Sequence, residues 1–186
     1  MNDDIFLRVN QFAIDTPWLH TPVAAYATYG ILLFGVLMVV GLWISRARGS
    51  SAIARALLVP VATLGAVAAQ QVVVALVAEP RPYAVHPQIL VLVGRSTDGS
   101  FPSDHACAVG AAAVALFFVD RRLGWIATVG AILMAAARVY AGAHWPMDVV
   151  AGLALGAALA LVIELVLARP VTAVVSRLRF HSGRTA

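Results

Sequence analysis

Residues 56–78, ALLVPVATLGAVAAQQVVVALVA, contain no charged side chain, and neither do residues 22–44, PVAAYATYGILLFGVLMVVGLWI. A helix needs about 20 mainly apolar residues to cross the hydrocarbon core of a bilayer, so each stretch predicts one transmembrane helix. The chain of 186 residues is 61% hydrophobic and 12% charged, with a mean hydropathy of +0.88. We therefore expect one membrane-embedded domain over residues 1–186.

Three further apolar segments, residues 106–119, 123–137 and 149–163, are shorter than this span length. They reach it only if the ionisable residues at their ends enter the membrane-depth part of the helices; these are Asp104, His105, Arg138 and Asp148. Ionisable side chains at that depth are costly and are usually functional. The predicted fold is an all-α polytopic bundle of five transmembrane helices. Residues 5–12 alternate loosely between apolar and polar and predict an N-terminal interfacial helix.

All 13 basic residues are arginine, and the net charge is +4. They are scattered between apolar runs, which argues against nucleic-acid binding. Short cytoplasmic loops are enriched in basic residues, so we expect the cytoplasmic side to be the one with Arg46, Arg48, Arg55, Arg121, Arg122, Arg169, Arg177, Arg179 and Arg184. The basic tail, residues 170–186, then lies inside. The N-terminus, residues 80–102 and the turn around His144 lie outside, with Arg8, Arg81, Arg95 and Arg138.

The first residues, Met1-Asn2-Asp3-Asp4, are acidic where a signal peptide carries positive charge. We therefore expect the whole chain to be retained. Cys107 is the single cysteine, which excludes an internal disulfide and a multi-cysteine metal site. We interpret it as a small packing residue.

Residues 79–83, Glu79-Pro80-Arg81-Pro82-Tyr83, directly follow the second predicted span. Two prolines restrict the backbone around Arg81, which gives its guanidinium a fixed direction at the interface. Taken alone, such an arginine is more often one that reaches the lipid headgroups from a helix end.

Residues 100–105, Ser100-Phe101-Pro102-Ser103-Asp104-His105, open the third predicted span. A Ser or Asp here is available as the N-cap, and a helix N-terminus favours anions such as phosphate. On its own, a Ser-Asp-His run is more often a capping arrangement than an active site.

Residues 138–148, RVYAGAHWPMD, join the fourth and fifth predicted spans. Gly142 and Pro146 end one helix and start the next, so Asp148 can face back toward His144. An aspartate that accepts one imidazole N–H fixes the tautomer and raises the nucleophilicity of the other nitrogen. A structural His–Asp pair and a helix cap by Asp148 are the alternatives.

Together, the three clusters bring arginines, histidines, a serine and a carboxylate to the ends of four helices on one membrane face. Phosphoryl transfer needs cations for the nonbridging oxygens, a nucleophile, and an acid for the leaving oxygen. The clusters contain each of these groups, and they therefore predict phosphoryl-transfer chemistry.

The clusters resemble the motifs of the type 2 phosphatidic acid phosphatase superfamily, Lys-x6-Arg-Pro, Pro-Ser-x-His and Ser-Arg-x5-His-x3-Asp. The matching residues are Arg81-Pro82, Pro102-Ser103-Asp104-His105, and Arg138 with His144 and Asp148. Val74 stands where the motif has lysine, and Ala137 where it has serine. Within the superfamily, the chain is most similar to undecaprenyl-diphosphate phosphatases of the bacitracin-resistance type, a subgroup that also lacks the lysine. The likeness extends to about residue 168.

This resemblance implies a catalytic mechanism and a substrate site. His144 attacks phosphorus to give a phosphohistidine, Asp148 orients His144, and His105 protonates the leaving lipid phosphate. The implied substrate-binding residues are Arg81, Ser103 and Arg138, to which we add Asp104 and Glu79. We interpret Glu79 as an ion-pair partner of Arg81 or Arg138, with a cation site between two substrate phosphates as the alternative. No metal and no other cofactor are implied.

The implied activity is hydrolysis of undecaprenyl diphosphate at the outer face of a bacterial plasma membrane, which serves cell-wall synthesis. The implied partners are a polyprenyl diphosphate and the bilayer. One alternative is the same chemistry on phosphatidylglycerol phosphate, phosphatidic acid or a prenyl-phosphoribose phosphate. Another is a non-catalytic protein that binds or transports lipid headgroups. A third is a divalent metal site made by His105, His144, Asp104 and Asp148, which would place two arginines beside the cation. The sequence leaves the oligomeric state open.

Overall fold

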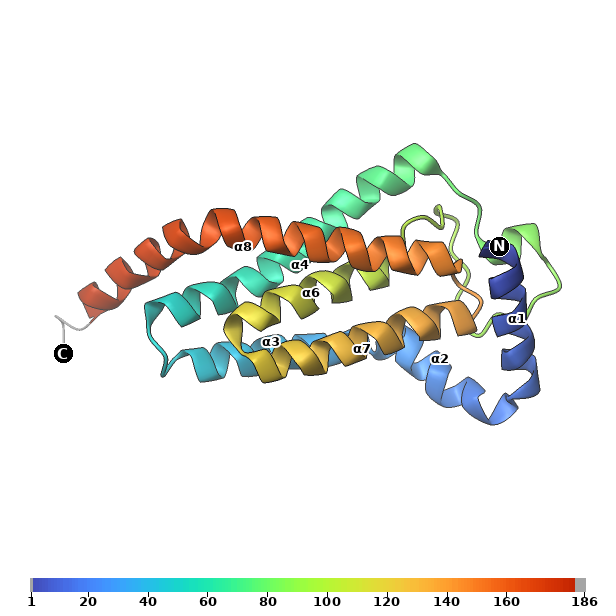
Figure 1. Ribbon diagram of the computed structural model, residues 1–186, viewed down its shortest axis with the longest axis horizontal. Helices are drawn as coiled ribbons and strands as arrows, with labels where there is room; N and C mark the ends of the chain where they lie inside the picture. The colour runs from blue at the N-terminus through green and yellow to red at the C-terminus, as the bar shows by residue number, and fades with distance from the viewer. Residues whose placement is uncertain (1, 183–186) are drawn as a thin grey trace.

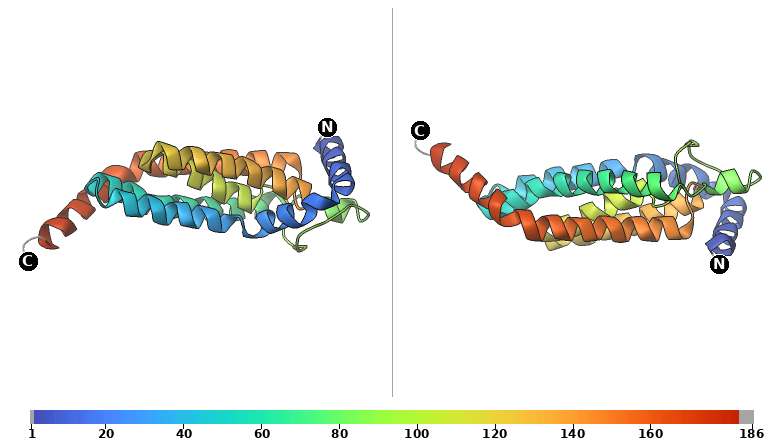
Figure 2. Two further views of the ribbon diagram at one scale, coloured as in Figure 1. Left: turned by 90° about the horizontal axis from the view of Figure 1, so that it is seen from below. Right: turned by 90° about the horizontal axis from the view of Figure 1, so that it is seen from above.

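A computed structural model describes residues 2–182 of the protein. Within these residues there are helices and no strand, which confirms the predicted all-α class. The helices are α1 (Asn2–Asp15), η1 (Pro17–Leu19), α2 (His20–Tyr29), α3 (Ile31–Ser45), α4 (Ser50–Val77), α5 (Pro82–Val85), α6 (Asp104–Val119), α7 (Arg121–Tyr140) and α8 (Pro146–Ser182). The long helices run alongside one another as an elongated bundle, and α1 lies across one end of it (Figure 1; Figure 2).

Helix α6 is the centre of the bundle. It packs against α3, α4, α7 and α8, and half of its 16 residues are buried alanines, Gly110 and Cys107. Small residues let helix backbones approach closely. At Gly156 of α8, a Cβ atom would lie only 2.0 Å from the carbonyl oxygen of Cys107. Close packing of α8 on α6 therefore depends on a glycine at this position.

Three helical segments are long and apolar enough to cross a membrane: Ser50–Val85, Arg121–Tyr140 and Pro146–Arg179. Helices α2 and α3 pass the same test together, as a pair bent by 51°, whereas α6 has only 16 residues. The structure thus supports three or four spans, and the fifth stays a prediction. Large apolar side chains such as Leu64 (70% exposed) and Leu165 (70% exposed) cover the outside of the bundle, as expected for a membrane protein whose surface faces lipid.

Residues 22–44 do not form the single helix that their hydropathy predicted. Helix α2 ends at Tyr29 and α3 begins at Ile31, with Gly30 at the bend. A Cβ atom at Gly30 would lie 2.5 Å from the carbonyl oxygen of Tyr26 and 2.7 Å from its ring. The hydroxyl of Tyr26 in turn donates to the carbonyl oxygen of Gly130 on α7 (2.9 Å). The bend thus lies beside a contact between helices, which a hydropathy pattern does not contain.

The two ends of the bundle contain different segments. At one end, the loop between α3 and α4 meets the turn between α6 and α7, and Arg48 pairs with Asp120 across them (3.0 Å). Helix α8 also extends beyond the bundle at this end (Figure 1) and continues through Pro170 to Ser182. The predicted tail is thus helical as far as residue 182, and its remaining residues, including Arg184, lie outside the described part. The opposite end contains α1 and the loop of residues 86–103.

Candidate active site

Helix α1 holds together the two segments that form the site, the loop of residues 86–103 and the turn of residues 141–145. The side chain of Asn10 donates to the carbonyl oxygen of Leu90 (2.8 Å) and accepts from its amide (3.1 Å). The ring of Phe6 packs edge-on against Trp145, with 5.1 Å between centroids. Gly142 has φ +75°, and a Cβ atom there would lie 2.5 Å from the Leu90 carbonyl oxygen. Only glycine fits where the turn meets the loop.

His144, in this turn, is enclosed, with 1% of its side chain exposed. Its Nδ1 lies 2.9 Å from the carbonyl oxygen of Ser100 and 3.4 Å from Oδ2 of Asp148. Both of these oxygens are acceptors, which assigns the ring proton to Nδ1. Nε2 therefore keeps its lone pair.

Two guanidinium groups face this lone pair. Nη1 of Arg81 lies 3.2 Å and Nη2 of Arg138 lies 3.4 Å from Nε2 of His144. Both arginines are also fixed by backbone carbonyls, Arg81 by Ala143 (3.2 Å) and Arg138 by Ala27 (3.3 Å). Two cations directed at one point in a buried site form an anion-binding centre.

The same surroundings set the protonation of His144. Burial lowers its pKa below the ordinary value of 6.5. The hydrogen bond to Asp148 opposes this shift, and the charges of Arg138 and Arg81 reinforce it. The imidazole is therefore kept neutral.

Asp148 lies at the start of α8 and is fully buried. Its Oδ2 accepts from the amide of Trp145 (2.9 Å) and from the hydroxyl of Ser100. The bond to Trp145 closes the first turn of α8, as a capping residue does. Asp148 is thus both the helix cap and the partner of His144, two roles that were alternatives in the sequence.

Helix α6 contributes the second histidine. Ser103 is its N-cap, and its hydroxyl oxygen accepts from the amide of Ala106 (3.4 Å). Oδ1 of Asp104 lies 3.0 Å from Nδ1 of His105 and 3.8 Å from Nε2 of His144. A pocket of about 380 Å³ opens here, which we call the inner pocket; its lining residues are Thr28, Arg81, Val93, Gly94, Ser96, Asp98, Asp104, His105 and Arg138.

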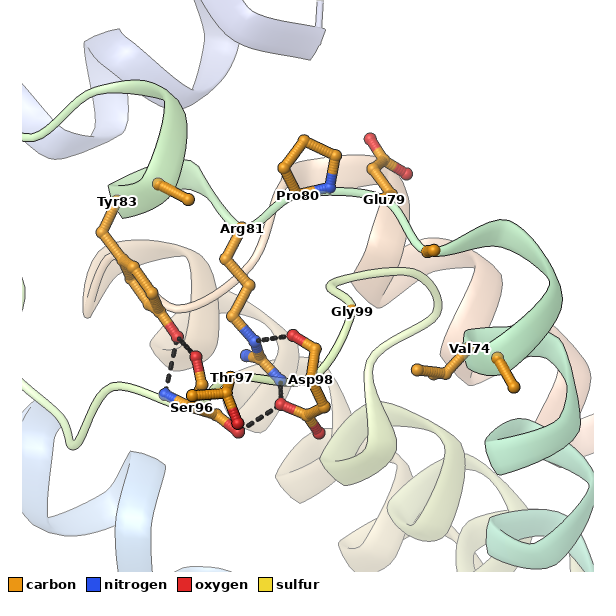
Figure 3. A pocket seen from close by; sticks show the side chains of 12 residues that line it. Val74, Glu79, Pro80, Arg81, Tyr83, Ser96, Thr97, Asp98 and Gly99 are labelled. Carbon is orange, nitrogen blue, oxygen red and sulfur yellow. Dashed lines mark hydrogen bonds and ion pairs between the residues drawn. The ribbon is translucent and has the colours of Figure 1, made fainter.

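Sequence reasoning did not single out Asp98, a residue of the loop. Its Oδ1 lies 2.9 Å from Nη2 of Arg81, and its carbonyl oxygen accepts from Nε of Arg81 (3.1 Å) (Figure 3). Burial raises the pKa of Asp98, but the hydrogen bond from Ser96 and the charge of Arg81 outweigh this, and the pKa lies below 3.8. No periodicity or motif spacing marks such a residue, because the loop takes its shape from its tertiary contacts.

Glu79 was expected to pair with Arg81 or Arg138. Its side chain points away from Arg81 (Figure 3), and the carboxylate paired with Arg81 is that of Asp98. The sequence indicated no role for Ser100, yet its hydroxyl and its carbonyl oxygen both contact the His144–Asp148 pair.

The metal-site alternative has no geometric support within residues 2–182. No group of three or more His, Cys, Asp or Glu side chains there is arranged to hold a metal ion. The positions next to His144 are taken by the two arginines instead.

A buried histidine with a carboxylate on one nitrogen and two arginines on the other, at the end of apolar helices, defines an anion-binding membrane protein. Residues 55–170 match the model of the PAP2 superfamily, and the chain belongs to this family. The expected family is thereby confirmed, and the matched residues include all of the motif positions.

Two curated relatives match part of the chain. Over 75 residues it is 36% identical to undecaprenyl-diphosphatase BcrC of Bacillus subtilis, a match that covers 40% of this chain and 38% of that protein. Over 78 residues it is 49% identical to lipid A 1-phosphatase of Rhizobium johnstonii, covering 41% of this chain and 31% of the relative. The chain thus spans about a third of the length of these relatives.

A solved structure shares the fold. The crystal structure described as the first transmembrane PAP2 type phosphatidylglycerolphosphate phosphatase from Bacillus subtilis superposes with a TM-score of 0.60 at 22% identity. The superposition covers 87% of this chain and 83% of that one. At this level of identity, the likeness shows the helical arrangement alone.

Proposed function

We propose that the protein is a lipid phosphatase that hydrolyses undecaprenyl diphosphate, or a similar polyprenyl diphosphate, to the monophosphate and inorganic phosphate. The main support is the convergence of Arg81 and Arg138 on Nε2 of His144, at 3.2 and 3.4 Å. The name of the Bacillus relative supports this substrate, whereas the name of the Rhizobium relative makes lipid A the second candidate.

In the first step, Nε2 of His144 attacks the terminal phosphorus and a phosphohistidine forms as the bond to the bridging oxygen breaks. Arg81 and Arg138 neutralise the nonbridging oxygens, on which charge accumulates. Asp148 and the Ser100 carbonyl hold the proton on Nδ1, which stabilises the positive charge that the ring acquires.

His105 supplies the proton for the leaving oxygen. Its Nδ1 is occupied by Asp104 (3.0 Å), so Nε2 is the nitrogen available to the inner pocket. In the second step, water attacks the phosphohistidine, His105 takes up its proton, and inorganic phosphate leaves.

The other predicted binding residues take different parts. The Ser103 hydroxyl binds a phosphoryl oxygen with its hydrogen, since its oxygen serves as the cap of α6. Asp104 acts through His105, because an ionised carboxylate is an acceptor only and repels phosphate. Glu79 lies at the entrance, on the wall of a neighbouring pocket.

We place the site on the outer face of a bacterial plasma membrane. This assignment rests on the arginines, which gather in the loops at the far end of the bundle, and on their preference for the cytoplasmic side. The C-terminal part of α8 is then cytoplasmic.

The test is release of inorganic phosphate by the detergent-purified protein in excess EDTA, with undecaprenyl diphosphate, lipid A and phosphatidic acid as parallel substrates and His144→Ala as the control. We expect EDTA-resistant release, fastest from the prenyl diphosphate and absent in the variant. Faster release from lipid A would assign the second candidate. No release from any lipid would favour a binding or transport protein.

A further inference from the structure

A second pocket lies on the other side of Arg81. It has a volume of about 640 Å³ and lies between the C-terminal end of α4 and the turn of residues 96–99 (Figure 3). We call it the rim pocket; it is lined by Val74, Ala75, Ala78, Glu79, Pro80, Arg81, Tyr83, Ala84, Ser96, Thr97, Asp98 and Gly99. The rim pocket and the inner pocket share Arg81, Ser96 and Asp98. The Arg81–Asp98 pair is therefore the partition between them.

The rim pocket has one apolar wall and one polar wall. One wall consists of Val74 and Ala75 from the last turn of α4 and of Ala78 directly after it, next to exposed apolar residues such as Leu76 (80% exposed). The facing wall is the turn of residues 96–99, which presents hydroxyls and a carboxylate. Glu79 also lines this pocket, but its side chain points away from Arg81 (Figure 3). A pocket with a hydrocarbon wall, a polar wall and one arginine fits a phosphate attached to an apolar chain.

Only one member of the Arg81–Asp98 pair is enclosed by the protein. Arg81 is buried, with 7% of its side chain exposed, whereas the Asp98 side chain is 49% exposed. Besides Arg81, its carboxylate is held by the hydroxyl of Ser96 from the same turn. A half-exposed ion pair of this kind is weak, and phosphate competes for the same guanidinium edge. Asp98 is thus an exchangeable anion: a phosphate can replace it, while Arg81 stays in place.

We propose that the rim pocket binds the lipid-linked half of the substrate. This half consists of the phosphate attached to the lipid and the first units of the hydrocarbon chain. The terminal phosphate then lies in the inner pocket, and Asp98 releases Arg81 as the substrate enters. This inference rests on the proposed phosphatase function and adds to it the place where the chain leaves the site.

The first experiment fills the rim pocket. Ala75→Phe adds a ring to its apolar wall, and Ala84→Phe does the same from α5. The matched control is Ala68→Phe, which lies two turns earlier on α4, is also exposed, and lines neither pocket. The probes are farnesyl diphosphate as substrate and inorganic phosphate as a competitive inhibitor that needs the inner pocket alone.

We expect both filling variants to raise KM for farnesyl diphosphate about tenfold, because each displaces the equivalent of roughly two buried methylene groups. The inhibition constant of inorganic phosphate should stay at the wild-type value, which also shows that the variants fold. Unchanged KM in both variants of an active enzyme would overturn the subsite. An inactive wild type would instead show that the proposed function has failed, and with it the inference.

The second experiment removes the exchangeable anion. Asp98→Asn should lower the inhibition constant of inorganic phosphate by about three- to fivefold, because the carboxylate no longer competes with phosphate for Arg81. This factor corresponds to the usual strength of an ion pair with an exposed member. Asp15→Asn, on α1, is the control for the loss of one negative charge. Equal or weaker inhibition in Asp98→Asn would contradict the exchange.

Discussion

The hydroxyl of Ser100 donates to Oδ2 of Asp148, and both side chains are completely buried. The carbonyl oxygen of the same serine lies 2.9 Å from Nδ1 of His144. Ser100 therefore contacts both members of the catalytic pair that we propose, although it lies outside the motif that predicted them. It fixes the carboxylate in place while its backbone holds the imidazole.

Ser100→Ala removes the hydroxyl and keeps the carbonyl. We expect kcat to fall about tenfold, because a hydrogen bond to a charged group contributes about 1.5 kcal/mol, and KM to change little, because Ser100 lines neither pocket. Phosphate release from farnesyl diphosphate measures both constants. Ser176→Ala, far along α8, is the control, and an unchanged kcat for Ser100→Ala would remove Ser100 from the mechanism.

The nucleophile and its partner should respond differently to substitution. We expect His144→Ala to abolish turnover, because it removes the lone pair that Arg81 and Arg138 face. Asp148→Asn should keep phosphate binding and lose about three orders of magnitude in kcat, since an amide no longer stabilises the charged ring. Single-turnover phosphate release and inhibition by inorganic phosphate separate the two effects. Full activity of His144→Ala would disprove the phosphohistidine.

The pH profile should reflect the lowered pKa of His144. Because burial disfavours the protonated ring, the neutral form persists as the pH falls through 6.5, and it is lost only at a lower pH. We therefore expect the acidic limb of kcat/KM, which reports the free enzyme, to have its midpoint below 6.5. A midpoint at or above 6.5 would mean that burial and the two arginines do not lower the pKa of this histidine.

The packing of α8 on α6 can be tested with two glycines. A Cβ atom at Gly156 would lie 2.0 Å from the Cys107 carbonyl oxygen, whereas nothing lies within 4 Å of one at Gly35 on α3. We expect Gly156→Ala to destabilise the protein by about 1–3 kcal/mol or more, as overpacking does. Gly35→Ala should be neutral or stabilise it by about 0.5–1 kcal/mol. Thermal unfolding in detergent measures both, and equal melting temperatures would argue against the tight crossing.

The features that the sequence predicted correctly are those with a local signal. The helix cap and the proline that starts α8 depend on a few neighbouring residues: a Ser or Asp was expected to cap α6, and Ser103 does, and Pro146 starts α8 as expected. The spacing from Arg138 to His144 and Asp148 also lies within one helix–turn–helix. Its geometry is almost fixed by the backbone, so motif spacing was enough to bring these residues together.

The features that escaped prediction depend on contacts between distant segments. The bend at Gly30 lies beside the contact of Tyr26 with α7, which hydropathy does not contain. The hydroxyl of Tyr83 holds Ser96 by its amide (2.8 Å) and its carbonyl (2.9 Å). These bonds fix the start of the turn of residues 96–99, in which Asp98 pairs with Arg81. Such a loop has no hydrophobic periodicity, and no motif fixes the sequence spacing between Asp98 and Arg81.

The enclosure of α6 also has a consequence for how the protein is made. Ribosomes deliver helices in order, and α6 emerges before α7 and α8, against which it packs. The amide of Ser103, at the start of α6, is satisfied by the carbonyl oxygen of Asp148 (3.0 Å), at the start of α8. A nascent chain that ends before α8 therefore lacks both Asp148 and the helix surface on which α6 packs. The activity that we propose can begin only once α8 has packed against α6, so a shorter chain should be inert toward the lipids around it.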